Sequence, residues 1–235
     1  MMSSSPRILL INPNSTVATT EMMLNIARRT AQGRLELDMA TADRSPSMIV
    51  NEVQLQASAA QVIEIATREA PNYDGIIVSA YGDPGVVALQ NRLAIPVIGI
   101  CEASMIEAGQ NGRKFGVATV TPDLADAIAA RADWLGYAQT YTGIRCTHGD
   151  PEQLAGNNDL LCKELAKAVN DCLQDDADAV IIGGGPLGEA AEFLRTWFEI
   201  PIIAPISAAV ELMISASQLG LDEPVEINDC VANRS

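Results

Sequence analysis

The chain has 235 residues, of which 48% are hydrophobic, and carries a formal net charge of −15 at pH 7. This length is enough for one large domain or for two domains of about 100–120 residues each. The acidic balance argues against nucleic acid or an anionic membrane as a partner, because both are bound through basic patches.

The cysteines and the first residues of the chain set further limits. The five cysteines are irregularly spaced, no CxxC motif occurs, and His148 is the single histidine. Neither a disulfide framework nor a zinc site is therefore expected. The apolar run Ile8–Ile11 is too short for a signal sequence or a membrane span. We expect a cytoplasmic protein that binds no metal and no membrane.

Short β-branched runs alternate with Ala-rich helical patterns along the chain. The predicted strands are Arg7–Ile11, Gly75–Val78, Pro96–Ile100, Phe115–Thr119, Ala179–Ile182 and Pro201–Ala204. The predicted helices are Val17–Gln32, Glu52–Glu69, Gly85–Leu93, Leu124–Trp134, Leu160–Gln174, Glu189–Trp197 and Ala208–Leu219. Strands separated by helices of this length predict an α/β fold with parallel, helix-covered sheets.

The second half of the chain resembles the first. Asp74–Ala80 and Asp178–Gly184 are similar, and each is followed by a helix and an Ile-Pro-apolar strand. Upstream, Arg7–Pro13 matches Lys114–Val120, so one shift superimposes both pairs. We therefore predict two similar lobes, one made of residues 1–103 with 208–235 and the other of residues 104–207.

The repeat equates four strand ends, which are those at Asn12, Ala80, Thr119 and Gly184. In open α/β sheets, ligands bind beyond the carboxyl ends of the strands. We therefore expect these four positions to face one cleft between the lobes.

The first and third strand ends carry small polar side chains. After the first strand, Ser15 and Thr16 favour capping of the next helix. Asn14 is a candidate for a substrate hydrogen bond, since two asparagines exceed what a cap requires. At the third end, Thr119 is either a ligand to substrate or part of a simple turn.

The second strand end reads Ser79-Ala80-Tyr81-Gly82-Asp83-Pro84. Asp83 before proline is typical of an N-cap, so structural capping of the following helix is the favoured role for Asp83. The preceding turn predicts backbone N–H groups that suit a carboxylate or an enolate. Tyr81 either donates to the same group or walls the pocket.

The fourth strand end, GGGPLG at residues 183–188, matches the dinucleotide motif GxGxxG. Pro186 breaks the usual turn, and no acidic residue ends the next strand, so we interpret the match as accidental. The glycines allow close approach of the backbone to a small ligand.

With these residues in view, the chain resembles the aspartate/glutamate/hydantoin racemase superfamily, in particular its hydantoin and allantoin racemase branch. The resemblance covers nearly the full length and rests on ILLINPNST, YGDPG, IPVIGICEASM, GRKFGVAT and IPIIAPISAAVELM. It implies two Rossmann-like lobes related by a pseudo-twofold axis, an active site in the interlobe cleft, and no cofactor. We also expect a homo-oligomer.

The resemblance further implies a mechanism. Racemases of this superfamily place one cysteine in each lobe, so that one thiolate removes the α-proton and the other thiol returns a proton to the opposite face. In this branch the first cysteine precedes the aromatic-Gly-Asp-Pro-Gly turn, and the second lies in the small-residue turn after the late strand. Those positions are Ala80 and Gly184 in this chain, and neither side chain can carry a proton.

Three explanations for the missing thiols stay open. Ala80 replaces a cysteine by engineering, to trap a complex of a one-cysteine hydrolase, lyase or decarboxylase. Alternatively both losses are natural, and Ser79, Tyr81, Asp83 or a bound water supplies the chemistry, for instance in amide or imide hydrolysis. The third explanation is a scaffold that binds without turnover.

The sequence thus predicts a hydantoin-racemase-like isomerase that acts on a small hydantoin, amide, cyclic ureide or carboxylate through an enolate or oxyanion. The alternatives are a hydrolase or lyase without the two-cysteine mechanism and a non-catalytic binding protein. A further alternative, a nucleotide-dependent oxidoreductase, is supported only by the GGGPLG motif. The expected substrate-binding residues are Asn14, Ser15, Tyr81, Gly82, Thr119, Gly185 and Pro186.

Overall fold

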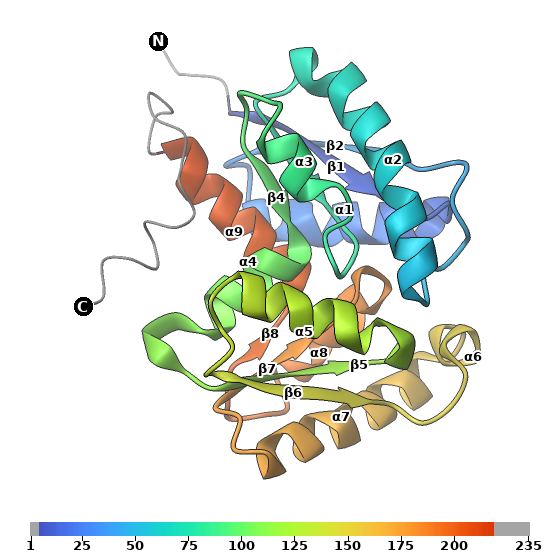
Figure 1. Cartoon of the computed structure of the whole chain (residues 1–235), viewed down its shortest axis with the longest axis vertical. Coiled ribbons are helices and arrows are strands. Elements are labelled where there is room, and N and C mark those ends of the chain that lie inside the picture. Colours follow the sequence, from blue (N-terminus) through green and yellow to red (C-terminus); the bar gives the residue numbers. More distant parts are fainter. Residues whose placement is uncertain (1–4, 219–235) are drawn as a thin grey trace.

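The computed structural model describes residues 5–218, which form two four-stranded parallel sheets with helices packed around them (Figure 1). The strand order is β2-β1-β3-β4 in the first sheet and β6-β5-β7-β8 in the second. We call the parts around these sheets the N-lobe and the C-lobe. The strands are β1 (Arg7–Asn12), β2 (Glu36–Thr41), β3 (Gly75–Val78), β4 (Val97–Gly99), β5 (Phe115–Thr119), β6 (Tyr141–Cys146), β7 (Ala179–Ile182) and β8 (Ile202–Ile203).

The two sheets share one topology, because β5–β8 occupy the same places in their sheet as β1–β4 in theirs. In both sheets the first strand pairs with the second and the third, all in parallel. The four central strands β1, β3, β5 and β7 are almost entirely buried, as expected for parallel strands covered on both faces. The prediction of an α/β fold with two similar lobes is confirmed.

Helices follow the strands in both lobes. They are α1 (Val17–Ala31), α2 (Glu52–Glu69), α3 (Val86–Gln90), α4 (Ile100–Ala108), α5 (Ala125–Trp134), α6 (Pro151–Ala155), α7 (Asn158–Gln174), α8 (Gly188–Leu194) and α9 (Pro205–Gln218). Single 3₁₀ turns precede α5 and α8 at Pro122–Leu124 and Gly185–Leu187. No helix within residues 5–218 combines the length and apolar character that a membrane crossing needs.

Two helices connect the lobes. Helix α4 follows β4 of the N-lobe and packs against α5, β7 and β8 of the C-lobe, whereas α9 follows β8 and packs against α1, β3 and β4 (Figure 1). The two helices also pack against each other. The predicted boundaries at residues 103 and 208 fall inside α4 and α9, so the exact division into lobes stays a prediction. Residues 219–235 lie outside the described part of the chain.

Candidate active site

A small pocket lies where the lobes meet, at the carboxyl ends of the central strands. Its volume of about 50 Å³ is enough for a few water molecules. It is lined by Asn14, Met48, Ile49, Ser79, Ala80, Tyr81, Thr119, Val120, Thr121, Leu124, Gly183, Gly184, Gly185, Pro186 and Leu187. The structure therefore brings together all four strand ends that the repeat equates, with Asn14 in place of the buried Asn12 at the first of them.

At the first strand end, two asparagines hold each other in place. The Asn12 amide donates to Asn14 Oδ1 and to Thr20 Oγ1, each at 2.9 Å. Asn14 Oδ1 also accepts from the Thr16 N–H at 2.9 Å. The Asn14 carbonyl oxygen is thus occupied, whereas its Nδ2 has no hydrogen-bond partner within residues 5–218. This amide remains available as a donor to a ligand in the pocket.

The neighbouring Ser15 and Thr16 do not cap α1 with their side chains. Thr16 occupies the N-cap position without a side-chain cap bond, and its hydroxyl donates to the Ser47 carbonyl at 2.8 Å. The Ser15 N–H donates to the Pro46 carbonyl at 3.0 Å, and Ser15 is absent from the pocket lining. The prediction is thus correct for the position of Thr16 but not for a side-chain cap, because Ser15 and Thr16 instead hold the loop that follows β2, from which Met48 and Ile49 enter the pocket wall.

At the second strand end, Ser79 has a structural hydrogen bond. Its hydroxyl donates to the Ile11 carbonyl at 2.9 Å, and the residue is 1% exposed. A serine nucleophile needs a neighbouring base to take its proton, but this proton is already directed at a backbone carbonyl. Ser79 therefore joins β3 to β1 rather than presenting a nucleophile.

We expect Ser79→Ala to lower the free energy of unfolding by about 1 kcal/mol, the usual net worth of a buried hydrogen bond. Turnover should change by less than about threefold, because no reacting group is lost. Urea unfolding and steady-state kinetics on the same preparation measure both quantities. A loss of activity of a hundredfold or more in a folded variant would restore Ser79 as a nucleophile.

Tyr81 forms a wall of the pocket. It is 5% exposed, and its hydroxyl lies 3.4 Å from Ser104 Oγ on α4. Burial raises the pKa of Tyr81 well above its usual range, so the phenol stays neutral and can donate a hydrogen bond but cannot act as a base. The ring also packs against the C-lobe, since a Cβ at Gly183 would lie 3.0 Å from Tyr81 Cε1.

Asp83 does not cap the helix that follows it. The N-cap of α3 is Gly85, and Asp83 has a left-handed backbone with φ of 53°. Its carboxylate accepts from the N–H groups of Cys101 and Glu102, both at 2.8 Å, and so caps α4 instead. Gly99 permits this, because a Cβ there would lie 2.2 Å from Asp83 Cγ. Asp83 and Gly82 lie outside the pocket lining.

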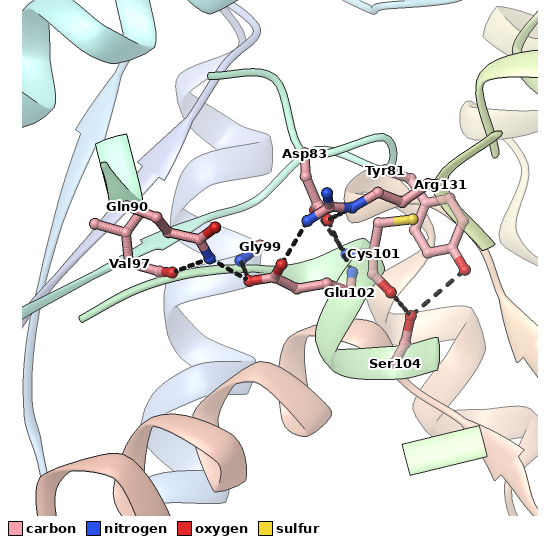
Figure 2. A network of polar contacts seen from close by, with 9 residues as sticks. All are labelled: Tyr81, Asp83, Gln90, Val97, Gly99, Cys101, Glu102, Ser104 and Arg131. Carbon is pink, nitrogen blue, oxygen red and sulfur yellow. Dashed lines mark hydrogen bonds and ion pairs between the residues drawn. The ribbon is translucent and has the colours of Figure 1, made fainter. Parts of the chain in front are cut away.

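The same carboxylate belongs to a buried group of charges formed by Asp83, Glu102 and Arg131, which we call the Arg131 cluster (Figure 2). Burial, with a further contribution from Asp83, raises the pKa of Glu102 to about 7. Burial also raises the pKa of Asp83, although Arg131 and two backbone N–H groups oppose the effect. The sequence offered no local signal for this cluster, since its members are far apart in the chain.

At the third strand end, Thr119 is only partly available to a ligand. Its hydroxyl donates to the Gly183 carbonyl at 2.6 Å. The Thr121 hydroxyl lies 3.3 Å from Thr119 Oγ1, and Thr121 lines the same wall. Because the Thr119 proton goes to Gly183, the Thr121 hydroxyl is the donor to Thr119 Oγ1, and the Thr121 oxygen is left as an acceptor on this side of the pocket.

The glycines of the fourth strand end allow the lobes to touch. A Cβ at Gly185 would lie 2.7 Å from the Ser79 carbonyl oxygen, and one at Gly188 would lie 2.6 Å from Ile26 Cδ1. Close contact between the lobes thus accounts for these glycines without a dinucleotide. Gly184 differs, because the atoms nearest to its Cβ would belong to the side chain of Leu187, in the same lobe, at 3.0 Å.

The pocket offers hydrogen bonds and apolar walls but few groups that exchange protons. Of its lining residues, Tyr81 alone has a titratable side chain. Cys101 lies nearby but is fully buried, and burial raises the pKa of its thiol well above the usual range, as expected for a structural cysteine. Within residues 5–218, no group of three or more His, Cys, Asp or Glu side chains is placed to hold a metal ion.

Comparisons with known proteins agree with this architecture. A hydantoin racemase of Pseudomonas sp. (strain NS671) is 28% identical over 91% of this chain and 87% of its own length. An uncharacterized protein of Schizosaccharomyces pombe is 31% identical over 92% and 93%. The allantoin racemase structure from Klebsiella pneumoniae superimposes with a TM-score of 0.87 at 26% identity, over 92% of this chain and 89% of the other. Since the family model for Asp/Glu/hydantoin racemases also matches residues 8–213, the chain belongs to that family.

Proposed function

We propose that this protein is a cofactor-independent enzyme that acts on a small hydantoin, a related cyclic ureide or amide, or a small carboxylate in the interlobe pocket. The observation that carries this proposal is the convergence of four strand ends on one pocket with apolar walls and a free amide donor. A hydrogen bond from that donor to a substrate carbonyl would stabilise an enolate or oxyanion at the same oxygen. The names of the similar racemases support an isomerase.

Ser15 and Gly82 are also predicted from the sequence to bind substrate, but neither lines the pocket, so we propose no direct contact between them and the substrate. The proposed contacts to substrate are made by Asn14, Tyr81, Thr119, Gly185 and Pro186, all of which do line it. To these the structure adds Thr121 as a hydrogen-bonding residue. Ala80 and Gly184 would flank the reacting carbon from the two lobes.

Incubating the protein with one enantiomer of a 5-alkylhydantoin in heavy water tests the proposal. Racemisation predicts that deuterium enters the α-carbon while the optical rotation disappears. Ring opening, detected by mass spectrometry, would instead identify a hydrolase. If neither reaction occurs on hydantoins, on allantoin or on small carboxylates, while calorimetry detects binding, the protein is a binding scaffold and the enzymatic proposal is wrong.

A hydrolase or lyase is the second candidate, and one observation favours it. No cysteine lines the pocket within residues 5–218, so the two thiols of the racemase mechanism are not available there. A water molecule held by Asn14 and Thr121 would then attack a ring carbonyl, and Tyr81 would donate a hydrogen bond. The ring-opening measurement separates this candidate from the first.

Asn14→Asp is expected to weaken binding of a hydantoin by about 10–100-fold. The substitution keeps the acceptor that orders the turn but exchanges the free N–H donor for an oxygen, and leaving the substrate carbonyl without its donor costs about 1–3 kcal/mol. Calorimetric titration measures the affinity. Asn157→Asp, which keeps the acceptor at the N-cap of α7 and lies outside the pocket lining, is the comparison, and equal affinities for Asn14→Asp and the wild type would remove Asn14 from the site.

A further inference from the structure

The Arg131 cluster connects the two lobes through charges. Arg131 lies on α5 of the C-lobe, whereas Asp83 follows β3 and Glu102 lies in the first turn of α4, which continues from β4 of the N-lobe. Arg131 Nε is 3.2 Å from Asp83 Oδ2, and Nη2 donates to Glu102 Oε2. Figure 2 shows the guanidinium directed at both carboxylates.

The contact is largely shielded from water. The side chains of Arg131, Asp83 and Glu102 are 9%, 1% and 0% exposed, and the Trp134 ring lies 4.4 Å from the guanidinium carbon. The remaining acceptor positions are filled by Gln90 Nε2 and the Gly99 N–H, which both donate to Glu102 Oε1. Buried ion pairs are poor sources of net stability compared with apolar packing, so stability alone is a weak reason for this arrangement.

Two of the charged residues are connected along the chain to walls of the pocket. Asp83 is two residues beyond Tyr81, in the turn that contains Ala80. Arg131 lies on the helix that follows the 3₁₀ turn ending at Leu124, another lining residue. A fixed distance between Asp83 and Arg131 therefore sets the distance between the wall at Tyr81 and the wall at Leu124.

We propose that Arg131 is a positioning residue, which holds the pocket in its closed arrangement through Asp83 and Glu102. The space of about 50 Å³ between the walls holds only a few water molecules, so we infer that the walls move apart when a larger substrate enters. Separation draws Arg131 away from the two carboxylates, and closure restores both contacts around the bound molecule. The inference rests on the proposed function only in taking this pocket as the ligand site.

The chain contains a matched control for this role. Arg29 on α1 and Glu189 on α8 form another ion pair between the lobes, 2.8 Å long, but their side chains are 57% and 51% exposed. Exposed pairs contribute little because water and salt screen them. Loss of Arg29 should therefore leave the pocket closed, whereas loss of Arg131 should open it.

Accessibility of the pocket provides a test that needs no substrate. In an Ala80→Cys background, the thiol at position 80 is alkylated with iodoacetamide and quantified by mass spectrometry of its peptide. Adding Arg131→Met should accelerate alkylation of this thiol by about tenfold or more, the effect of shifting a local opening equilibrium by one decade. Adding Arg131→Lys should give an intermediate rate, because lysine keeps the charge but lacks the planar fork. Adding Arg29→Met should leave the rate unchanged.

The buried Cys172 distinguishes opening from unfolding. It lies in the C-lobe core, 1% exposed, and reacts only when that lobe unfolds. Faster alkylation at residue 80 with Cys172 still protected supports the proposal. An unchanged rate at residue 80, or a rate that rises only together with that of Cys172, overturns it. If Arg131→Met does not fold, the Arg131→Lys protein decides the matter by the same two readings. Because no turnover is measured, a failed activity assay does not affect the outcome.

Discussion

The free energy of unfolding is expected to fall by about 3 kcal/mol as the pH rises from 4.5 to 7. The lower value is the ordinary pKa of a glutamate carboxyl, and the higher value is the pKa of Glu102 in the folded protein. Glu102→Gln is expected to remove most of this fall. The effect is large for one side chain, because the carboxyl is buried and shares the cation Arg131 with Asp83.

The sign follows from the order of the two pKa values. Burial is the main cause of the raised pKa of Glu102, Asp83 adds to it, and Arg131 opposes it. Between the two values the folded protein keeps a proton that the unfolded chain has released. The contribution of Glu102 to the free energy of unfolding is therefore fully present below pH 4.5 and is lost as the pH rises through 7. Each tenfold difference in proton affinity is worth about 1.4 kcal/mol. Asp83, with its raised pKa, acts in the same direction.

Urea unfolding between pH 4.5 and 8 measures this dependence. Glu102→Gln has a cost of its own, since one of its amide hydrogens faces Arg131, so the informative quantity is the slope with pH rather than the absolute stability. Glu64→Gln, at an exposed residue on α2, removes one negative charge outside the cluster and should keep the wild-type slope. Equal slopes for wild type and Glu102→Gln would mean that Glu102 is ionised throughout this range in the folded protein.

The parts of the fold that sequence predicted share a physical property. The strands predicted within each half are buried apolar runs, such as Gly75–Val78 and Ala179–Ile182, and parallel pairing requires such runs to be covered on both faces. The missed strands, β2 and β6, lie at sheet edges and are only partly buried. Charged and small residues interrupt the apolar pattern of β2 and β6, so the sequence shows no clear strand periodicity there.

The missed features of the site depend on contacts between distant residues. Helix α4 begins directly after β4, and the N–H groups of Cys101 and Glu102 in its first turn donate to Asp83, which lies outside the helix. Local capping rules assigned that carboxylate to the nearer helix, although its positive φ turns it toward α4. Arg131 likewise lies on α5, whereas Asp83 lies in the turn after β3 and Glu102 lies on α4. Sequence could therefore place the strand ends around one pocket, but not the charges that fix their separation.

The structure around Ala80 and Gly184 leaves room for the missing thiols. Ala80 lines the N-lobe wall of the pocket, and Gly184 lines the C-lobe wall. Gly184 has extended backbone with φ of 161°, which any residue adopts. A Cβ there would approach Leu187 Cγ at 3.0 Å, so that side chain must shift by a few tenths of an ångström.

The double variant Ala80→Cys/Gly184→Cys is expected to racemise a 5-alkylhydantoin about 10²–10⁴ times faster than the wild type, the usual contribution of positioned acid–base groups. One thiolate would remove the α-proton and the thiol on the other lobe would supply a proton to the opposite face. Polarimetry and deuterium incorporation in heavy water measure the gain. The serine pair Ala80→Ser/Gly184→Ser has nearly the same shape without a thiol, and should show none.

The single variants test whether the two positions face opposite sides of the substrate. A lone thiol takes the proton and returns it to the same face, so each single variant should exchange deuterium while optical rotation persists. Ala80→Cys and Gly184→Cys should act on opposite enantiomers, because their side chains come from opposite lobes. Exchange of the same enantiomer by both would contradict this placement. If crowding by Leu187 blocks Gly184→Cys, adding Leu187→Ala should recover exchange, since it removes Cγ and Cδ1, the two atoms nearest to a Cβ at 184.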